Sequence, residues 1–152
     1  MARKVVVAND HAGLELKREL LPSLAEWGWQ VEDLGCQGAE SVDYPDFALA
    51  VARRVAESDE IGLLLCGTGI GMSIAANKVA GVRAALCADT YSAWASRAHN
   101  NANVLCLGGR VIGPEVAREV LRAFLNTDFE GGRHQRRLDK IARLEETDRG
   151  QR

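Results

Sequence analysis

The amino-acid sequence predicts a doubly wound α/β domain: a mainly parallel, five-stranded sheet with helices on both faces, Rossmann-like in architecture. Three observations lead to this class. Short apolar segments alternate with longer segments of helical spacing along the chain. The apolar segments are continuous, as in strands that are covered on both faces. Glycines and small polar clusters follow them, which is typical of turns into helices.

The predicted strands are short, and each ends before a turn. They cover residues 5–8, 31–34, 61–66, 82–88 and 104–107. The predicted helices cover residues 14–27, 45–57, 72–78, 90–97, 114–125 and 134–146. Pro45 and Pro114 stand at the start of two helices, where proline is favoured, and Asp89 is placed to cap another. Gly28 stops the first helix, and Gly81 separates the third helix from the fourth strand.

The length of 152 residues predicts a single domain, residues 1–152, large enough to bury a sizeable core. A composition of 47% hydrophobic and 26% charged residues is typical of globular proteins. The net charge of -2 gives no general attraction to nucleic acid or to a membrane surface. No apolar run approaches the ~18 residues of a membrane-spanning helix, and the start of the chain lacks the apolar run of a signal peptide. We therefore expect a cytoplasmic protein with no nucleic-acid and no membrane partner.

The four cysteines favour reduced thiols over a disulfide framework. Cys36, Cys66, Cys87 and Cys106 form no C-x-x-C pair, and no cysteine–histidine cluster has the spacing of a zinc site. Three of the four lie in or at the end of apolar strands, which fits a reducing compartment. The sequence therefore predicts neither a bound metal nor a disulfide.

The segment after the third strand combines a thiol with a glycine loop. Cys66 ends the strand, and Gly67, Gly69 and Gly71 alternate through the turn into the next helix. Backbone N–H groups and a helix N-terminus favour negative charge, so the loop predicts an anion cradle that biases the thiol toward thiolate. The G-x-G-x-G spacing fits neither a P-loop nor a dinucleotide fingerprint, so no nucleotide cofactor is indicated. The plainer alternative is an ordinary turn with a buried cysteine.

Polar residues after other strands are expected at the same edge of the sheet, because ligands of such folds bind outside the carboxyl ends of the strands. Asp10 and His11 follow the first strand, Asp89 follows the fourth, and Arg110 follows the fifth. His99 lies instead at the end of a helix. Its place at this edge does not follow from the pattern alone.

The residues at this edge favour proton abstraction next to a carbonyl, with the developing enediolate oxygen held in the cradle. Arg133 and Arg137 share one helix face at i,i+4 and form a candidate phosphate clamp, with a solvated basic turn as the alternative. Covalent thiol catalysis, as in hydrolases, would use the same cysteine and histidine and is not excluded.

Five motifs resemble the ribose-5-phosphate isomerase B family, a group that also holds galactose-6-phosphate isomerase subunits. They are residues 10–13, 41–45, 66–78, 96–104 and 130–134. The resemblance extends from Val5 to about Leu144, nearly the whole chain, with the motifs in the family's order. It implies a cofactor-free isomerase that interconverts D-ribose 5-phosphate and D-ribulose 5-phosphate through a cis-enediolate, a reaction of the pentose phosphate pathway.

The resemblance also implies an assembly and a set of site residues. It implies a homodimer, or a tetramer, with active sites shared between subunits and the C-terminal helix at the dimer interface. Cys66 matches the family's catalytic base, and Thr68 would assist it. His99 matches the residue that helps to open the furanose ring, with Asp10 nearby. The implied contacts to the phosphorylated sugar are Asp10, His11, Gly67, Thr68, Gly69, Ile70, Gly71, Asn100, Arg110, Arg133 and Arg137.

Some alternatives stay open within the resemblance. One branch of the family carries a glutamate base just after the glycine loop; Met72 stands there in this sequence, so the chain resembles the cysteine-using branch. A six-carbon substrate such as allose 6-phosphate or galactose 6-phosphate would fit the same machinery. A non-catalytic phosphate- or nucleotide-binding module is the alternative from another class. Tyr44 and His134 lie in matching motifs, and their roles are not assigned.

Overall fold

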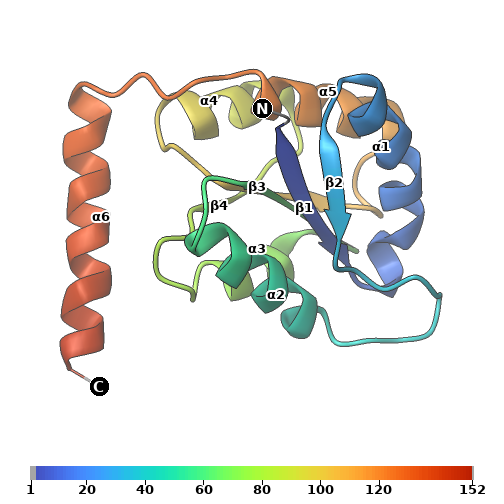
Figure 1. Ribbon diagram of the computed structural model, residues 1–152, viewed down its shortest axis with the longest axis horizontal. Coiled ribbons are helices and arrows are strands. Elements are labelled where there is room, and N and C mark those ends of the chain that lie inside the picture. The colour runs from blue at the N-terminus through green and yellow to red at the C-terminus, as the bar shows by residue number, and fades with distance from the viewer. Residues whose placement is uncertain (1–2, 152) are drawn as a thin grey trace.

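The computed structural model describes residues 3–151, so residues 1, 2 and 152 of the predicted domain lie outside the described residues. Its centre is a five-stranded sheet in the order β2-β1-β3-β5-β4 (Figure 1). Every pair of neighbouring strands is parallel. The strands are β1 (Lys4–Asn9), β2 (Gln30–Asp33), β3 (Ile61–Cys66), β4 (Ala84–Leu86) and β5 (Val104–Gly108). The predicted fold class is confirmed.

Helices cover both faces of the sheet. The helical elements are η1 (His11–Gly13), α1 (Leu14–Glu26), α2 (Tyr44–Ala56), α3 (Ile70–Ala76), α4 (Thr90–Ala98), α5 (Pro114–Leu125) and α6 (Arg133–Gly150). α1, α4 and α5 pack on one face, and α2 and α3 pack on the other. α6 stands outside these layers, beyond the β4 edge (Figure 1). None of the helices in the described part of the chain is both long and apolar enough to span a membrane.

The alternation of side chains along β3 divides the core in two and aims the final thiol. Leu63 and Leu65 pack into the cluster that contains α1 and α5. Leu64 and Cys66 point the other way, into the cluster that contains α2 and α3. All four side chains are buried, as expected for a central strand of a covered parallel sheet. Cys66 therefore emerges on the side of α3, the helix that follows the glycine loop.

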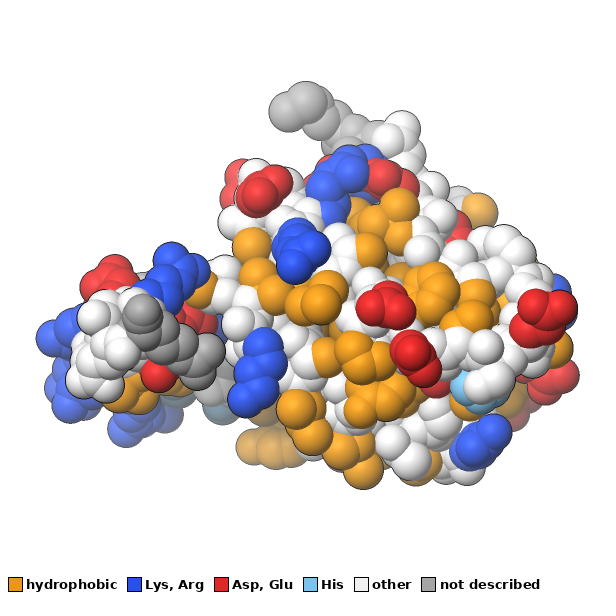
Figure 2. All heavy atoms as spheres, turned by 90° about the horizontal axis from the view of Figure 1, so that it is seen from below, with side chains coloured by type: hydrophobic (Ala, Val, Ile, Leu, Met, Phe, Trp, Pro, Cys, Tyr) orange, Lys and Arg blue, Asp and Glu red, His pale blue; other side chains and the backbone are white. Residues whose placement is uncertain are grey.

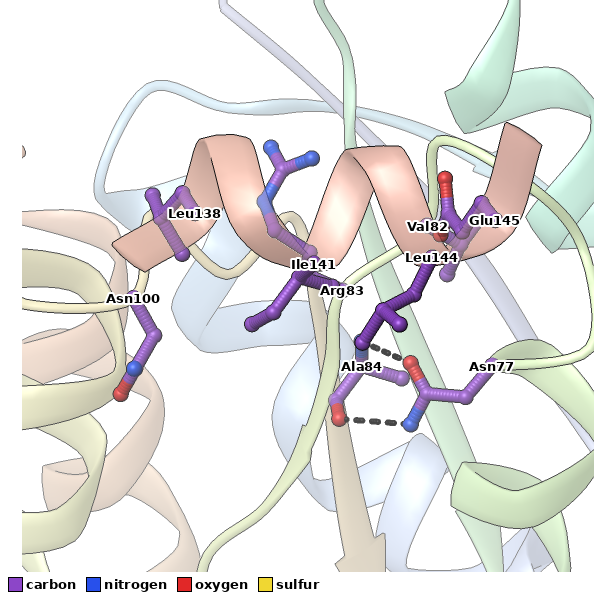
Figure 3. Close-up of a pocket in the computed structure, with 9 residues that line it drawn as sticks. All are labelled: Asn77, Val82, Arg83, Ala84, Asn100, Leu138, Ile141, Leu144 and Glu145. Atoms are coloured by element: carbon purple, nitrogen blue, oxygen red, sulfur yellow. Dashed lines mark hydrogen bonds between the residues drawn. The ribbon is translucent and has the colours of Figure 1, made fainter. Parts of the chain in front are cut away.

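The fourth strand is shorter than the predicted 82–88, and the N–H groups of the two residues before it have other partners. The N–H of Arg83 donates to the side-chain Oδ1 of Asn103 at 2.7 Å. The N–H of Val82 donates to Val79 in a turn, 3.1 Å away. The side-chain amide of Asn77 then pairs with Ala84 as a neighbouring strand would: its Oδ1 accepts from the Ala84 N–H at 2.8 Å, and its Nδ2 donates to the Ala84 carbonyl at 3.0 Å (Figure 3). A side chain thus covers part of the free edge that β4 presents, which blunts pairing with other strands.

A charged residue lies on the apolar face of α1. Lys17 is 1% exposed, although Leu14, Leu20 and Leu24 on the same face are core residues. Its ammonium lies 2.9 Å from the carboxylate of Asp33 at the end of β2 and donates to the Cys36 carbonyl at 2.9 Å. These contacts fasten the loop after β2 to α1. A buried ammonium is tolerated here because its donors have partners.

Candidate active site

The glycine loop after β3 folds so that its backbone meets the Cys66 thiol. Gly69 has φ +80°, a conformation that favours glycine, and it directly precedes α3. α3 therefore begins at Ile70, two residues before the predicted start. A Cβ on Gly69 would lie 2.6 Å from a methyl carbon of Leu86 and 3.0 Å from the Leu107 carbonyl carbon. Only glycine fits this position without strain or displacement of β5.

The Cys66 sulfur accepts a hydrogen bond from the loop that follows it. Cys66 is 4% exposed, and its Sγ lies 3.1 Å from the backbone N–H of Gly69. This backbone donor fixes the position of the sulfur against the loop. The loop is itself braced, since the Thr68 hydroxyl oxygen accepts from the Ile70 N–H at 3.2 Å. Thr68 and Ile70 are exposed at the surface of the loop.

The carboxyl ends of β1, β3 and β5 meet around this loop. The N–H of Asp10 donates to the Leu65 carbonyl at 3.1 Å, just before Cys66. The N–H of Gly109 donates to the Cys66 carbonyl at 2.8 Å. The N–H of Arg110 donates to the Gly67 carbonyl at 2.9 Å. Asp10, the thiol, the glycine loop and Arg110 are therefore brought together by backbone hydrogen bonds.

Hydrogen bonds to backbone N–H groups hold the side chains of Asp10 and His11 at this edge. Asp10 is buried, and its Oδ1 accepts from the N–H groups of Ala12 and Gly13 at 2.9 and 3.1 Å, which fixes the carboxylate. The Nδ1 atom of His11 accepts from the Val42 N–H at 3.2 Å, so the neutral imidazole carries its proton on Nε2. The Nε2–H group of His11 can therefore donate a hydrogen bond to a ligand.

Tyr44 is also placed against the loop. A Cβ on Gly71 would lie 2.5 Å from the Tyr44 ring, which shows how closely the ring covers this glycine. Tyr44 is the first residue of α2 and is partly exposed. Gly71 thus gives room for an aromatic side chain that borders the thiol loop.

His99 and Asn100 lie at the opposite edge of the sheet from Cys66. α4 returns from the carboxyl edge, and His99 follows its last residue. The chain then enters β5 through Asn103, whose carbonyl accepts from the N–H of Gly62 near the start of β3. From Gly62 to Cys66 is four residues, about 13 Å of strand. The structure therefore does not bring His99 and Asn100 to the Cys66 of the same chain.

Aromatic and acidic groups surround His99. Its ring stacks on that of His134 with centroids 4.4 Å apart and meets the edge of Trp94 at 5.0 Å. Its Nε2 lies 3.9 Å from a carboxylate oxygen of Glu130. Burial lowers the pKa of His134, and the neighbouring His99 lowers it further. Arg133 and Arg137 are exposed on the same first turns of α6 as His134.

The sequence pattern missed the grouping of His99 with Trp94, Glu130 and His134. Only the short motif 130–134 carried a signal, and it gave no partner for His99. A hydrogen bond supplies the link, because the Glu130 N–H donates to the Ala98 carbonyl at 3.0 Å. The predicted site residues thus form two groups, one at each edge of the sheet.

Comparison with known proteins identifies the family. The Ribose/Galactose Isomerase family matches residues 5–141. The chain belongs to this family. It is 46% identical to Ribose-5-phosphate isomerase B of Escherichia coli, over 95% of this chain and 97% of that protein.

Solved structures of family members agree with the fold. The type B ribose 5-phosphate isomerase of Trypanosoma cruzi is 48% identical, covers 97% of this chain and 99% of its own, and superposes with a TM-score of 0.94. Ribose-5-phosphate isomerase B of Mycoplasma genitalium with bound ribulose-5-phosphate is 44% identical, covers 96% and 98% of the two chains, and has a TM-score of 0.92. The sheet and its helices are therefore those of this isomerase family.

Proposed function

We propose that this protein is a cofactor-free aldose–ketose isomerase that interconverts D-ribose 5-phosphate and D-ribulose 5-phosphate. The observation that carries the proposal is the Cys66 thiol, held by the Gly69 N–H at the carboxyl edge of the sheet. The similarity to the Escherichia coli and Mycoplasma genitalium isomerases supports the reaction and the substrate. A thiol with a backbone donor and no nucleotide motif suits proton transfer at carbon.

In the proposed mechanism, the Cys66 thiolate removes the proton from C2 of the open-chain aldose. The negative charge moves to the carbonyl oxygen and gives a cis-enediolate. Backbone N–H groups of the loop 67–71 stabilise it, other than those of Gly69 and Ile70, which donate to the Cys66 sulfur and the Thr68 hydroxyl. Each well-placed donor of this kind is worth roughly 3 kcal/mol of barrier. The hydroxyl proton passes from O2 to O1, and Cys66 returns its proton to C1. Thr68 positions the loop, and Asp10 with His99 assists ring opening.

The separation of Cys66 and His99 supports an active site made by two copies of the chain. We infer that His99, Asn100, Arg133 and Arg137 of a second copy complete the site around Cys66, with the arginines on the substrate phosphate and with His11 and Arg110 contributed by the first copy. Bidentate arginine contacts suit a phosphate group. A closed twofold dimer forms two such sites.

Exposed apolar surface supports this assembly. Ile70 and Ile74 of α3 are 51% and 58% exposed, and Ile141 and Leu144 of α6 are 46% and 69% exposed. A cavity of about 380 Å³ lies between α6 and the β4 edge, lined partly by Leu138, Ile141 and Leu144 (Figure 3). Figure 2 shows α6 as a separate lobe beside a face rich in hydrophobic side chains. We therefore propose a homodimer with α6 at its interface; a tetramer would be two such dimers.

A coupled assay of ribose 5-phosphate to ribulose 5-phosphate, with EDTA present, tests the proposal. The wild type should turn over, and Cys66→Ala should lose isomerisation while keeping the fold by circular dichroism. Near-normal turnover by Cys66→Ala would overturn the role of the thiol. A wild type inactive on every pentose and hexose phosphate would favour the binding-module alternative.

A six-carbon sugar phosphate is the second candidate substrate, because the family description names galactose as well as ribose. The same thiol and cradle would serve either sugar, so pocket depth decides between them. Values of kcat/KM for ribose 5-phosphate, allose 6-phosphate and galactose 6-phosphate, measured side by side, distinguish the candidates. A higher value for either hexose phosphate would replace the first assignment.

We propose a reducing, cytoplasmic location for this activity. All four cysteines are free thiols, and Cys66 must stay reduced to act as a base. Fractionation of cells that express the protein tests this location. Recovery in a secreted fraction would contradict it.

A further inference from the structure

Three potential metal ligands meet at the amino edge of the sheet. His99, Glu130 and His134 each offer one ligand atom, and these atoms lie within 4.8 Å of one another. The two imidazole rings are stacked with only 16° between their planes, and Glu130 approaches the Nε2 of His99 to 3.9 Å. The cluster lies outside the thiol loop, and the isomerisation proposed above needs no metal there.

Backbone contacts fix the places of all three ligands. His99 directly follows α4 and is braced by the edge of the Trp94 ring. The Glu130 N–H donates to the Ala98 carbonyl at 3.0 Å, which ties its loop to the end of α4. His134 lies in the first turn of α6 and is buried. The group is therefore built by two segments that are distant in sequence, the end of α4 and the stretch that leads into α6, rather than by one exposed helix.

The ligand set points to a particular class of ion. Two imidazoles and one carboxylate, with a fourth position open to water, is a common zinc arrangement, whereas magnesium prefers oxygen ligands. Ligand atoms of a tetrahedral zinc site lie about 3.4 Å apart. Closing from the observed spacing requires rotation of the histidine rings and approach of Glu130, whose side chain is 48% exposed. We propose that His99, Glu130 and His134 bind Zn²⁺ and that binding inhibits the isomerase.

The inhibitory consequence rests on the proposed function. A zinc ion occupies the nitrogen lone pair that His99 needs to accept and donate protons, so ring opening stops while the ion is bound. The nearby Arg133 and Arg137 oppose a cation, and this repulsion limits the affinity. Inhibition is therefore reversible: a chelator removes the ion and restores turnover.

Direct binding is the first measurement. The wild-type protein, freed of metal with EDTA and then desalted, is titrated with ZnCl₂ against a chromophoric zinc indicator. Glu130→Gln and His134→Ala should each weaken zinc binding at least about tenfold. Glu146→Gln, which removes an exposed carboxylate elsewhere on α6, is the matched control and should bind as the wild type does. MgCl₂ at the same concentration should not displace zinc from the protein, and the indicator signal should therefore stay unchanged.

Inhibition is measured separately, in the coupled assay, as a fraction of each protein's own zinc-free activity. Glu130→Gln should resist zinc concentrations that inhibit the wild type and Glu146→Gln, and EDTA should reverse the inhibition. Zinc binding that survives in both Glu130→Gln and His134→Ala but is lost in Cys66→Ser would overturn the proposal in favour of the thiol. Because binding is read without turnover, a protein that binds zinc through this cluster but isomerises nothing would refute only the proposed function.

Discussion

Mixing two inactive variants tests whether the active site is shared between subunits. Cys66→Ala removes the proposed base, and His99→Ala removes the proposed ring-opening residue; each homodimer should be inactive. Cys66 and His99 lie at opposite edges of the sheet, separated along β3 by about 13 Å. A site within one chain would need the two side chains in contact with one substrate. In a mixed dimer, by contrast, Cys66 of one copy faces His99 of the other, and one of the two sites is intact.

The expected recovery follows from random pairing. Equal amounts of the two variants give half mixed dimers, and each carries one working site, so the mixture should regain about a quarter of the wild-type activity. A purified mixed dimer, selected through two different affinity tags, should regain about half. The coupled assay reports the rate, and tag recovery confirms that mixed dimers form. Two variants of the same edge, Cys66→Ala with Asp10→Ala, serve as the control and should recover much less, because every site in every pairing then lacks either Cys66 or Asp10. Verified mixed dimers of Cys66→Ala and His99→Ala with no activity would refute the shared site.

Other variants test the loop, the buried ion pair and the thiol. Gly69→Ala should lower the unfolding free energy by about 2 kcal/mol and reduce kcat, because its Cβ meets β5 at positive φ; urea unfolding that matches the wild type would contradict this. Lys17→Met should cost about 2 kcal/mol at neutral pH by removing the charged donor from Asp33, which keeps the hydrogen bonds from Gly35 and Gln37. Burial acts to raise the pKa of Asp33, but hydrogen bonds, including that from Lys17, lower it on balance. Because the pKa of Asp33 is lower in the folded than in the unfolded state, the ionised carboxylate stabilises the fold at pH values above the unfolded-state pKa. This stabilisation is lost as the pH falls through the folded-state pKa, so the difference in unfolding free energy between Lys17→Met and the wild type should shrink below about pH 4. A difference that stays constant with pH would argue against the ion pair. Iodoacetamide at pH 8 should modify Cys66 before Cys87, because burial raises the pKa of Cys87 to about 11, and sugar phosphate should protect Cys66; equal labelling by mass spectrometry would count against a reactive thiol.

Local sequence signals, such as capping residues and prolines at helix starts, predicted most of the helices and strands of the fold. The Asp89 carboxylate accepts from the Ser92 N–H at 2.7 Å and caps α4, as predicted. Pro45 and Pro114 lie in the first turns of their helices. β4 was predicted too long because its flanking apolar residues are typical of a strand, whereas the N–H of Val82 donates to Val79 in a turn and the N–H of Arg83 donates to the side chain of Asn103. Such a tertiary partner leaves no mark on the apolar pattern of the strand itself.

Lys17 shows the same limit in the core. Helical spacing from Leu14 to Leu24 puts position 17 on the buried face, yet lysine is an improbable core residue by type alone. Burial becomes acceptable only because Asp33 and the Cys36 carbonyl, from another part of the chain, meet its ammonium. Periodicity therefore gave the correct face, and the partners that permit the charge there came from the folded structure.

The site divides into a part that topology predicts and a part that it does not. Residues that directly follow parallel strands must share an edge, so Asp10, Cys66 and Arg110 were placed together from sequence. His99 follows a helix, and the nine residues of α4 carry the chain about 13 Å back across the sheet. If the proposed site needs both groups, then activity depends on association of two copies as well as on chemistry. Activity per chain should then fall on dilution below the dimer dissociation constant, while the fold of each chain persists, and substitution of an exposed α6 residue such as Leu144 should lower activity without touching the thiol.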